Sequence, residues 1–217
     1  MKPLSKKRDT KNEILLAACE LIAQKGYREV SMKNIALKVG IKPASIYGHY
    51  ASKELILEDL LDYCLERMEL FYQKFEDTCS NIPPNPKLEE LLEKLMLTYE
   101  PDELPLMYNL TRIVHHEQFH STKAAEALIG SGYRRYMEAH VKFFDGLSAA
   151  GLIDSTERNH HYGELFARLS LTFATQFLHP DIKPTIENQS ELYRFIIPLI
   201  IHYEQSAAFN TADTAIK

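Results

Sequence analysis

The sequence lacks the marks of a membrane-spanning, disulfide-linked or nucleotide-binding protein. No apolar run approaches the roughly 18 to 20 residues that a membrane span needs. The charged segment 1–8 has no apolar block behind it, as a secretory signal would, so we expect a cytoplasmic protein with no membrane partner. The 3 cysteines lie far apart, which argues against a disulfide framework or a cysteine-based zinc site. The glycine patterns of P-loops, dinucleotide-binding folds and G-x-S-x-G hydrolases are absent as well.

What the sequence does have is an uneven distribution of charge. Its 217 residues are 45% hydrophobic, enough for a sizeable core, and carry a net charge of −5. Residues 1–54 hold 11 Lys and Arg against 5 Asp and Glu, whereas residues 55–217 hold 14 against 25. A head of charge +6 on a body of charge −11 indicates that the head meets a polyanion. A solvated basic tail would account for the cations of segment 6–8 but not for Lys33, Lys42 and Lys53.

The first helix is predicted over residues 11–25. Thr10 and Glu13 have the spacing of a capping box, in which each side chain satisfies a free backbone N–H. Gly26 follows as a C-terminal stop. Between them the apolar residues recur with a period near 3.6, at Ile14, Leu15, Ala18, Leu21 and Ile22.

Two shorter helices follow, joined by a tight turn. Ser31 can cap the first of them, and Gly40 ends it. Pro43 suits the first turn of the second, residues 43–49, because its missing N–H would be unpaired there. Ser52 then caps a longer helix that begins at Lys53.

This layout is typical of a helix-turn-helix, whose second short helix enters the DNA major groove. In segment 43–49, Ile46 would face the core, and the other side chains are small or polar enough to approach a base edge or a phosphate. Lys53 could hold a backbone phosphate, and Lys33 could reach the DNA likewise. The alternative is a small helical core with a tight turn and no DNA contact.

Segment 30–56 resembles the DNA-binding signature of the TetR family of repressors. The resemblance covers about residues 10–60 and rests on Ile35-Ala36, Gly40-Ile41, Ile46-Tyr47, His49-Tyr50 and Lys53-Glu54-Leu55. It implies phosphate contacts for Tyr47, His49 and Lys53, and positions at or near the bases for Lys33, Pro43, Ala44, Ser45 and Gly48. Lys42 adds positive charge to this DNA-binding set. Tyr50 departs from the pattern, since phenylalanine is commoner at its position.

The expected fold class is all-α throughout. A three-helix helix-turn-helix domain occupies residues 1–55, with a basic arm at 1–9, and a helical ligand-binding and dimerisation domain occupies residues 56–206 before a flexible tail at 207–217. Proline- and glycine-containing breaks predict helices over residues 53–79, 87–98, 105–120, 122–150, 157–178 and 190–206. The fourth of these has a possible break at its glycines. Strand-like alternation and internal repeats are not evident in the sequence.

The last two predicted helices carry more apolar surface than a single neighbour can cover. Two such helices from each copy would form the four-helix dimer interface that the resemblance also implies, unless they pack only within the chain. A homodimer would set two reading helices one DNA turn apart, roughly 34 to 36 Å. The expected interface residues are Leu165, Leu169, Phe173, Phe177, Leu192, Phe195, Ile196, Leu199, Ile200 and Tyr203.

A cavity for a small-molecule effector is expected among the helices between residues 53 and 150. Arg112 lies beside an apolar stripe and, if buried, would need an anionic partner, either the ligand or a glutamate. The hypothesis is a transcriptional regulator of double-stranded operator DNA, by the resemblance a repressor that a ligand releases; an activator would show the same features. The residues expected near the cavity, each of which could instead belong to the core, are Tyr99, Tyr108, Arg112, His115, Phe119, Tyr136, Phe143 and Phe144.

One motif points to an enzyme instead. His116-Glu117-Gln118-Phe119-His120 matches the H-E-x-x-H pattern of zinc hydrolases, whose two histidines share one face of a helix. A catalytic zinc needs a third protein ligand, for which His115, His140, His160 and His161 are candidates. The motif also falls just before Ser121, where the helix is expected to end. We therefore predict no catalytic residue, metal or cofactor, and keep a zinc hydrolase and a helical interaction module without DNA binding as alternatives.

Overall fold

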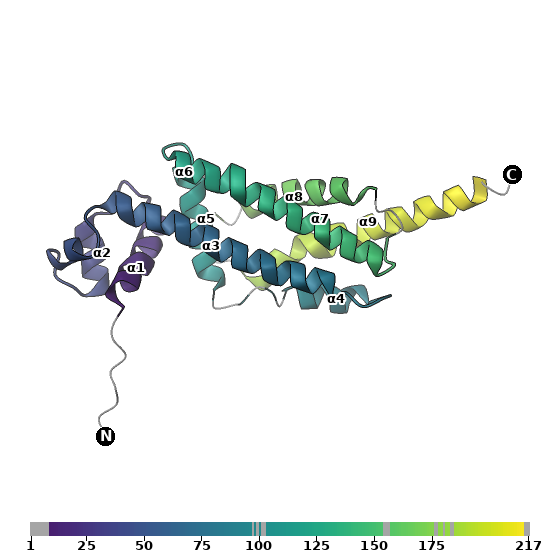
Figure 1. The fold of residues 1–217 in the computed structure, drawn as a ribbon, viewed down its shortest axis with the longest axis horizontal. Coiled ribbons are helices and arrows are strands. Elements are labelled where there is room, and N and C mark those ends of the chain that lie inside the picture. Colours follow the sequence, from purple (N-terminus) through teal and green to yellow (C-terminus); the bar gives the residue numbers. More distant parts are fainter. Residues whose placement is uncertain are drawn as a thin grey trace, which may run out of the picture.

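The computed structural model describes residues 9–96, 98, 100, 103–153, 157–175, 178–179, 181–182 and 185–214, without the side chains of residues 131, 173–174, 186–189 and 207–214. Over these residues the chain is helical and contains no strand, which confirms the all-α prediction. The helices form a small head at one end of an elongated body (Figure 1). In chain order they are α1 (Thr10–Lys25), α2 (Met32–Val39), η1 (Ser45–Gly48), α3 (Lys53–Ser80), α4 (Leu88–Met96), α5 (Leu104–Glu117), α6 (Thr122–Ala125), η2 (Glu126–Gly132), α7 (Tyr133–Ala149), α8 (Asn159–Thr175) and α9 (Ile186–Thr214).

Local capping determines where the head helices begin and end. The Ser31 hydroxyl accepts from the Asn34 backbone N–H at 3.2 Å, while the Asn34 side chain accepts from the Ser31 N–H at 2.9 Å. Gly40 ends α2 as predicted, because its left-handed φ of 76° turns the chain so that the next N–H, of Ile41, donates to the Ala36 carbonyl at 3.0 Å. The predicted cap at Thr10 is wrong by one residue, since the Asp9 carboxylate accepts from the Asn12 N–H at 3.2 Å. A carboxylate also interacts more favourably with the helix dipole than a hydroxyl does.

The third helix of the head is shorter than predicted. Over segment 43–49 only η1, a single 3-10 turn, forms, and Pro43 lies in the turn before it. Few residues separate Gly40 from the Ser52 cap of α3, and Gly48 disfavours a helix, so an α-helical nucleus does not repay its entropic cost there. Ile46 is fully buried, as expected.

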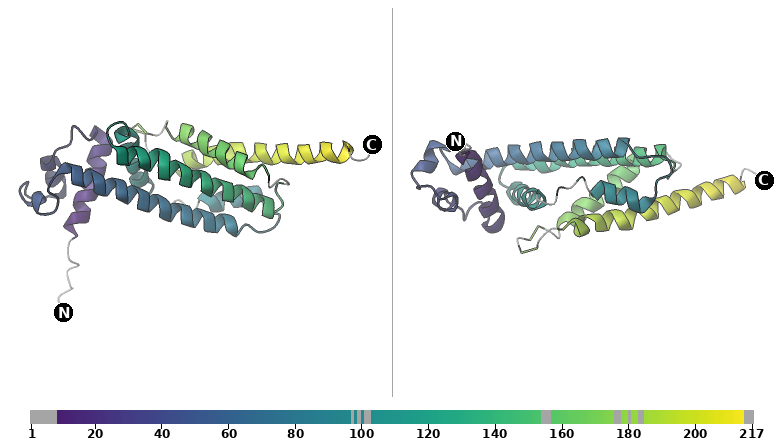
Figure 2. Two further views of the ribbon diagram at one scale, coloured as in Figure 1. Left: turned by 45° about the horizontal axis from the view of Figure 1, so that its top comes forward. Right: turned by 90° about the horizontal axis from the view of Figure 1, so that it is seen from below.

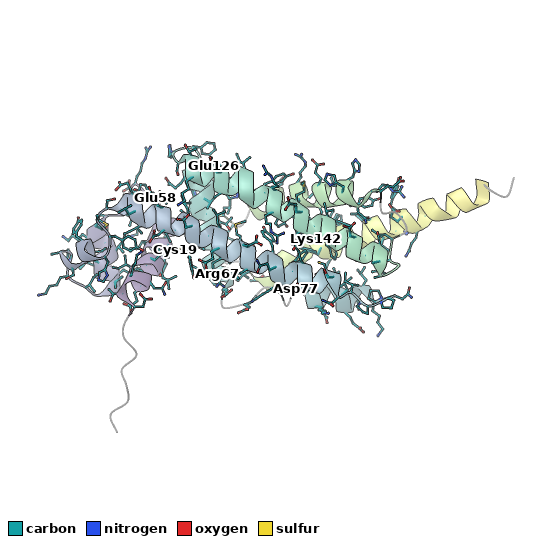
Figure 3. The ribbon with its side chains drawn as sticks, in the orientation of Figure 1. Cys19, Glu58, Arg67, Asp77, Glu126 and Lys142 are labelled. Carbon is teal, nitrogen blue, oxygen red and sulfur yellow. The ribbon has the colours of Figure 1, made fainter. Side chains whose placement is uncertain are left out.

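The head has a core of its own, which α3 and α5 complete. This head core includes buried residues of α1, α2, η1 and the first half of α3, together with Leu110, Ile113 and Val114 of α5, Ala124 of α6 and Ala127 of η2. The predicted domain boundary at residues 55 and 56 therefore falls within one continuous cluster. Figure 3 marks Glu58, Arg67 and Asp77 along α3, which leads from the head through the length of the body.

The body core is a second cluster, built around α7. Its buried residues come from the second half of α3, from α4, α7, α8 and α9, and from Ile153. α7 approaches α8 closely at Gly163, where an added Cβ would lie 2.7 Å from the Val141 backbone nitrogen. The right-hand view of Figure 2 places α9 on the side of the body opposite α3. Met68 packs against both cores, so it marks the level at which the head core gives way to the body core.

The structure corrects the predicted ends of α5 and α9 and shows no break at the glycines near residue 130. α5 ends at Glu117 rather than at residue 120, because residues 118–120 form a turn before Ser121 caps α6. The glycines near residue 130 do not break the helix; they lie in η2, a π-helix that joins α6 to α7 without interruption. α9 continues to Thr214 because no glycine or proline follows Pro198 to stop it.

A buried histidine organises the aromatic part of the body core. The Nδ1 atom of His140 lies 2.8 Å from the Tyr136 carbonyl oxygen, and its Nε2 atom lies 2.7 Å from the Tyr193 hydroxyl on α9. The imidazole stacks on Phe166 with ring centroids 4.9 Å apart. Burial lowers the pKa of His140 to about 4, so the ring is neutral at neutral pH.

This burial makes part of the stability depend on pH. In the unfolded chain the pKa of His140 returns to about 6.5, so below that pH the unfolded state binds the proton more readily and stability is lost as pH falls toward 4. Replacing His140 with Gln removes this contribution. The difference in unfolding free energy between the wild type and His140→Gln should narrow by about 2 kcal/mol between pH 7.5 and pH 5, as measured by urea denaturation.

The matched control is His116→Gln, because His116 is an exposed histidine of α5. This variant should keep the pH dependence of the wild type. A gap between wild type and His140→Gln that is equal at both pH values would contradict the assignment of this dependence to His140.

Candidate nucleic-acid interface and internal cavity

The head presents a small polar surface that its own core holds in place. Ile46 is the buried residue of η1, and its neighbours Tyr47, Gly48 and His49 are exposed, Tyr47 by 57%. The structure therefore brings together on the outside of the head the predicted residues Lys42, Pro43, Ala44, Ser45, Tyr47, Gly48 and His49. Lys33 is also exposed, in the first turn of α2. Side chains of this kind, fixed on short elements, can reach a groove and its phosphates.

Lys53 is placed differently from the other predicted residues. Its ammonium donates to the carbonyl oxygens of Tyr27 and Val30, at 2.7 and 2.8 Å, and lies 4.1 Å from the centre of the Tyr27 ring. Lys53 thus fastens the turn between α1 and α2 to the first turn of α3. The sequence analysis missed this role, because the two carbonyls lie more than twenty residues away in the chain.

Tyr50, the one departure from the family pattern, has a local explanation. Its hydroxyl donates to Asp59 Oδ2 at 2.9 Å, and the ammonium of Lys11 lies 3.0 Å from the same carboxylate oxygen. The bond from Lys11, opposed by partial burial, lowers the pKa of Asp59. The extra hydroxyl therefore has a partner in the fold and ties η1 to α3.

A cavity of about 180 Å³ lies in the body next to the head. Its walls come from α3, α5, η2, α7 and α8, with Leu178. Cys64, Val114 and Ala127 line this cavity and are also buried in the head core, so the cavity and the head share a wall. Of the residues predicted for the effector site, the structure places Tyr108, His115 and Tyr136 in this lining. Residues that the sequence analysis missed include Met68, Leu128 and Tyr133.

The other predicted cavity residues lie elsewhere. Phe119 is 81% exposed in the turn after α5, because that helix ends two residues earlier. Phe143 and Phe144 are fully buried in the body core, where Phe75 and Tyr193 fill the space around Phe143. Tyr99 lies outside the described residues.

Arg112 is buried, and among the described residues it donates to backbone carbonyls and to a side-chain amide. One guanidinium nitrogen donates to the carbonyl oxygens of His179 and Ile182, at 2.8 and 2.9 Å, and another to the Asn109 side chain at 3.1 Å. Arg112 therefore anchors the segment after α8 to α5 and does not line the cavity. These backbone carbonyls reach Arg112 because the loop that carries them packs over α5.

The predicted dimer residues fall into two sets. Leu165 and Leu169 of α8 and Phe195, Leu199 and Tyr203 of α9 are exposed, with Phe195 at 66%, and we call this apolar set the α8–α9 face. Leu192 and Ile196 are half-buried at its edge. Ile200 is wrong for this face, because it points into the body core with Ile197. The side chain of Phe173 and the whole of Phe177 lie outside the described residues.

The zinc motif does not have the helical geometry of the zinc hydrolases in the described structure. His116 and Glu117 belong to α5, but His120 lies beyond its end, so the two histidines do not share a helix face. Both ring nitrogens of His140, one candidate for a third ligand, are occupied within the body core. Over the part of the chain that the structure describes, no group of three potential metal ligands occurs. Nor is any described helix long and apolar enough to cross a membrane.

Comparison with known proteins assigns the head. The family described as bacterial regulatory proteins, tetR family, matches residues 14–60, which contain most of α1, all of α2 and η1, and the start of α3. Over these residues the head is therefore similar to the TetR family. This match confirms the resemblance carried by segment 30–56, and the exposed residues around η1 lie within the matched residues.

The TetR-family relatives extend the comparison into the body. The transcriptional repressor KstR2 of Mycobacterium tuberculosis is 31% identical over 93 residues, which are 43% of this chain and 44% of the relative, so this match spans less than half of the length of KstR2. KstR2 of Rhodococcus jostii is 25% identical over 200 residues, covering 89% of this chain and 91% of the relative. The crystal structure of the regulator AibR in complex with isovaleryl coenzyme A and operator DNA is similar in fold, with a TM-score of 0.54 at 22% identity over 84% of this chain and 95% of AibR.

The position of Lys53 yields a prediction that separates a structural role from a phosphate contact. Lys53→Met keeps the side-chain stem but removes both hydrogen bonds to the α1–α2 turn, so the unfolding free energy should fall by about 1 to 3 kcal/mol in urea denaturation. The matched control Lys33→Met replaces an exposed lysine and should stay within about 0.5 kcal/mol of the wild type. Lys53 would be a phosphate contact alone if its variant were as stable as the control and lost only salt-dependent affinity for duplex DNA.

Proposed function

We propose that this protein is a dimeric, DNA-binding transcriptional regulator of the cytoplasm, a repressor that a small molecule releases from its operator. The observation that carries the proposal is the exposed set around η1, mounted over the buried Ile46 within the TetR-family domain. The positive charge of residues 1–54 supports contact with a polyanion, and the acidic body would face away from it. The similarity to KstR2, a transcriptional repressor, and to AibR, whose crystal structure contains operator DNA, supports the same activity.

Within this proposal the residues have distinct tasks. Tyr47 and His49 contact backbone phosphates and position the head, while Pro43, Ala44, Ser45 and Gly48 let the head approach base edges closely. Lys33 and Lys42 add electrostatic affinity at the same surface. Lys53 holds the head in shape and has one N–H left for a phosphate, because two of its three donors are used within the fold.

The α8–α9 face would join two copies of the chain. Its exposed leucines and aromatics extend over two neighbouring helices, and apolar surface of this kind favours burial against a partner. A second copy related by a two-fold axis buries the same face on both chains. The two heads would then read half-sites one DNA turn apart. One short reading element alone would bind DNA too weakly for this task.

The cavity would connect the effector to the heads. Because Cys64, Val114 and Ala127 belong both to its wall and to the head core, a ligand that favours one arrangement of these residues also favours one position of α3 and the head. Binding shifts the population only if the ligand has different affinities for the two states. Release from DNA follows when the favoured state sets the heads at the wrong spacing.

DNA binding through the surface around η1 predicts a specific pattern of variants. Fluorescence anisotropy with a labelled duplex of about 30 base pairs should show binding that weakens steeply with salt. Tyr47→Ala should weaken binding by roughly tenfold, and Lys33→Ala should lower the salt slope by about one unit. The control Lys87→Ala replaces an exposed lysine of the body, and its binding should match the wild type. Equal effects of Lys33→Ala and Lys87→Ala, or no duplex binding at all, would leave only a helical interaction module.

The dimer interface has its own test. Leu199→Glu places a charge at the centre of the α8–α9 face, and sedimentation equilibrium should find it monomeric at concentrations where the wild type is dimeric. The control Leu70→Glu changes an exposed leucine of α3 and should remain dimeric. The proposed interface is wrong if Leu199→Glu sediments as a dimer, or if the wild type is a monomer.

A further inference from the structure

The cavity beside the head has a lining without charge. Among the described residues that form it, none is Asp, Glu, Lys or Arg, and most are apolar, with Met68, Phe71, Leu104, Met107, Leu128 and Leu171 making up much of the wall. Arg112, the one cation that the sequence suggested for this site, is held by backbone carbonyls outside it. A buried ligand charge would therefore meet no opposite charge, and burying an unpaired charge is very costly.

His115, Tyr108 and Tyr136 of the lining are also in their neutral forms. Burial, aided by the neighbouring His116, lowers the pKa of His115, which favours the uncharged imidazole at neutral pH. Burial raises the pKa of Tyr108 and of Tyr136 to about 12, so both phenols keep their protons. The cavity wall thus offers hydrogen bonds without formal charge.

One polar atom of the lining lacks a protein partner. The hydroxyl of Tyr133 is buried and has no hydrogen-bond partner among the described residues, whereas the Thr111 hydroxyl already donates to the Met107 carbonyl at 2.8 Å. A buried hydroxyl without a partner is destabilising by about 1 to 3 kcal/mol, so such groups normally have a role. Tyr133 begins α7 directly after the π-helix η2, which packs so closely that a Cβ on Gly132 would come within 2.3 Å of the Ala127 carbonyl oxygen.

The size of the cavity limits the ligand further. Its volume is about 180 Å³. An apolar protein cavity of about 150 Å³ accommodates benzene, so this one suits a single ring with a short substituent.

We propose that this cavity binds an uncharged, single-ring-sized apolar compound bearing one hydrogen-bonding group, which pairs with the Tyr133 hydroxyl. The proposal rests on the proposed function, since it names the class of effector for that regulator. Its basis is the uncharged lining, the buried Tyr133 hydroxyl and the volume together. A phenol with a short alkyl group has this chemistry.

Isothermal titration calorimetry at about pH 7.5 tests the class with four probes of similar size. 4-Ethylphenol is neutral with a hydroxyl, ethylbenzene is neutral without one, 4-hydroxybenzoate is an anion and tyramine is a cation. 4-Ethylphenol should bind best, and the two ions at least about tenfold more weakly, because neither finds a counter-charge. The proposal is overturned if an ion binds as tightly as 4-ethylphenol, or if neither neutral compound binds.

Variants then locate the binding. Tyr133→Phe should weaken the affinity for 4-ethylphenol by about threefold to tenfold, because the hydroxyl contact is lost. Its affinity for ethylbenzene should stay within about twofold of the wild type. Leu128→Trp should fill the cavity and abolish both, whereas the control Ile129→Trp changes the exposed neighbouring residue and should bind normally. Leu171→Trp fills the cavity from α8 and keeps the test available if Leu128→Trp does not fold. If Tyr133→Phe lost the same affinity for both neutral probes, the proposed hydrogen bond to Tyr133 would be wrong.

The same samples separate this inference from the proposed function. Duplex affinity measured by anisotropy with and without 4-ethylphenol reports on regulation alone. Binding in calorimetry without any change in duplex affinity would contradict ligand-controlled release yet leave the ligand class intact. Release of the duplex by an ionic probe that binds in the cavity would contradict the ligand class yet support ligand-controlled release.

Discussion

The continuity of α3 through both cores is the constraint on which the rest of the structure depends. Its first half supplies Ile56, Leu60 and Cys64 to the head core, and its second half supplies Tyr72 and Phe75 to the body core. A 28-residue helix is about 42 Å long and stiff, so the head cannot turn independently of it. Any rearrangement of the body that tilts α3 is therefore carried to the surface around η1.

The head is small, and α5 supplies buried apolar residues that its own helices do not provide. Leu110 and Ile113 complete the head core from outside the family-defining domain, and Lys53 closes the α1–α2 turn over it. Cys64 of α3 and Val114 of α5 line the cavity and also belong to the head core. A ligand that changes the packing of these residues therefore changes the packing of the head core as well. This shared wall gives the proposed regulation a physical route that needs no separate hinge.

Features with local causes could be predicted from the sequence, and features that depend on distant partners could not. Ser31, Gly40 and Ser52 mark helix ends because their hydrogen bonds close within four residues. Arg112 and Ile200 were misplaced for the opposite reason. Helical periodicity shows that Ile200 is apolar-facing but not which neighbour covers it, and no pattern near Arg112 reveals that a loop seventy residues away supplies its acceptors. The neutral lining of the cavity likewise emerges only when five elements are assembled around it.

Movement of the two heads on ligand binding is the central claim, and distance measurement by pulsed electron spin resonance tests it most directly. The cysteines 19, 64 and 79 are buried, so a Leu37→Cys variant, at a position 59% exposed on α2, can carry a spin label at one site per chain. The account predicts one inter-label distance distribution in the duplex-bound dimer and a distinctly different one when 4-ethylphenol fills the cavity. An unchanged distribution, at a ligand concentration where calorimetry shows the cavity to be occupied, would contradict it.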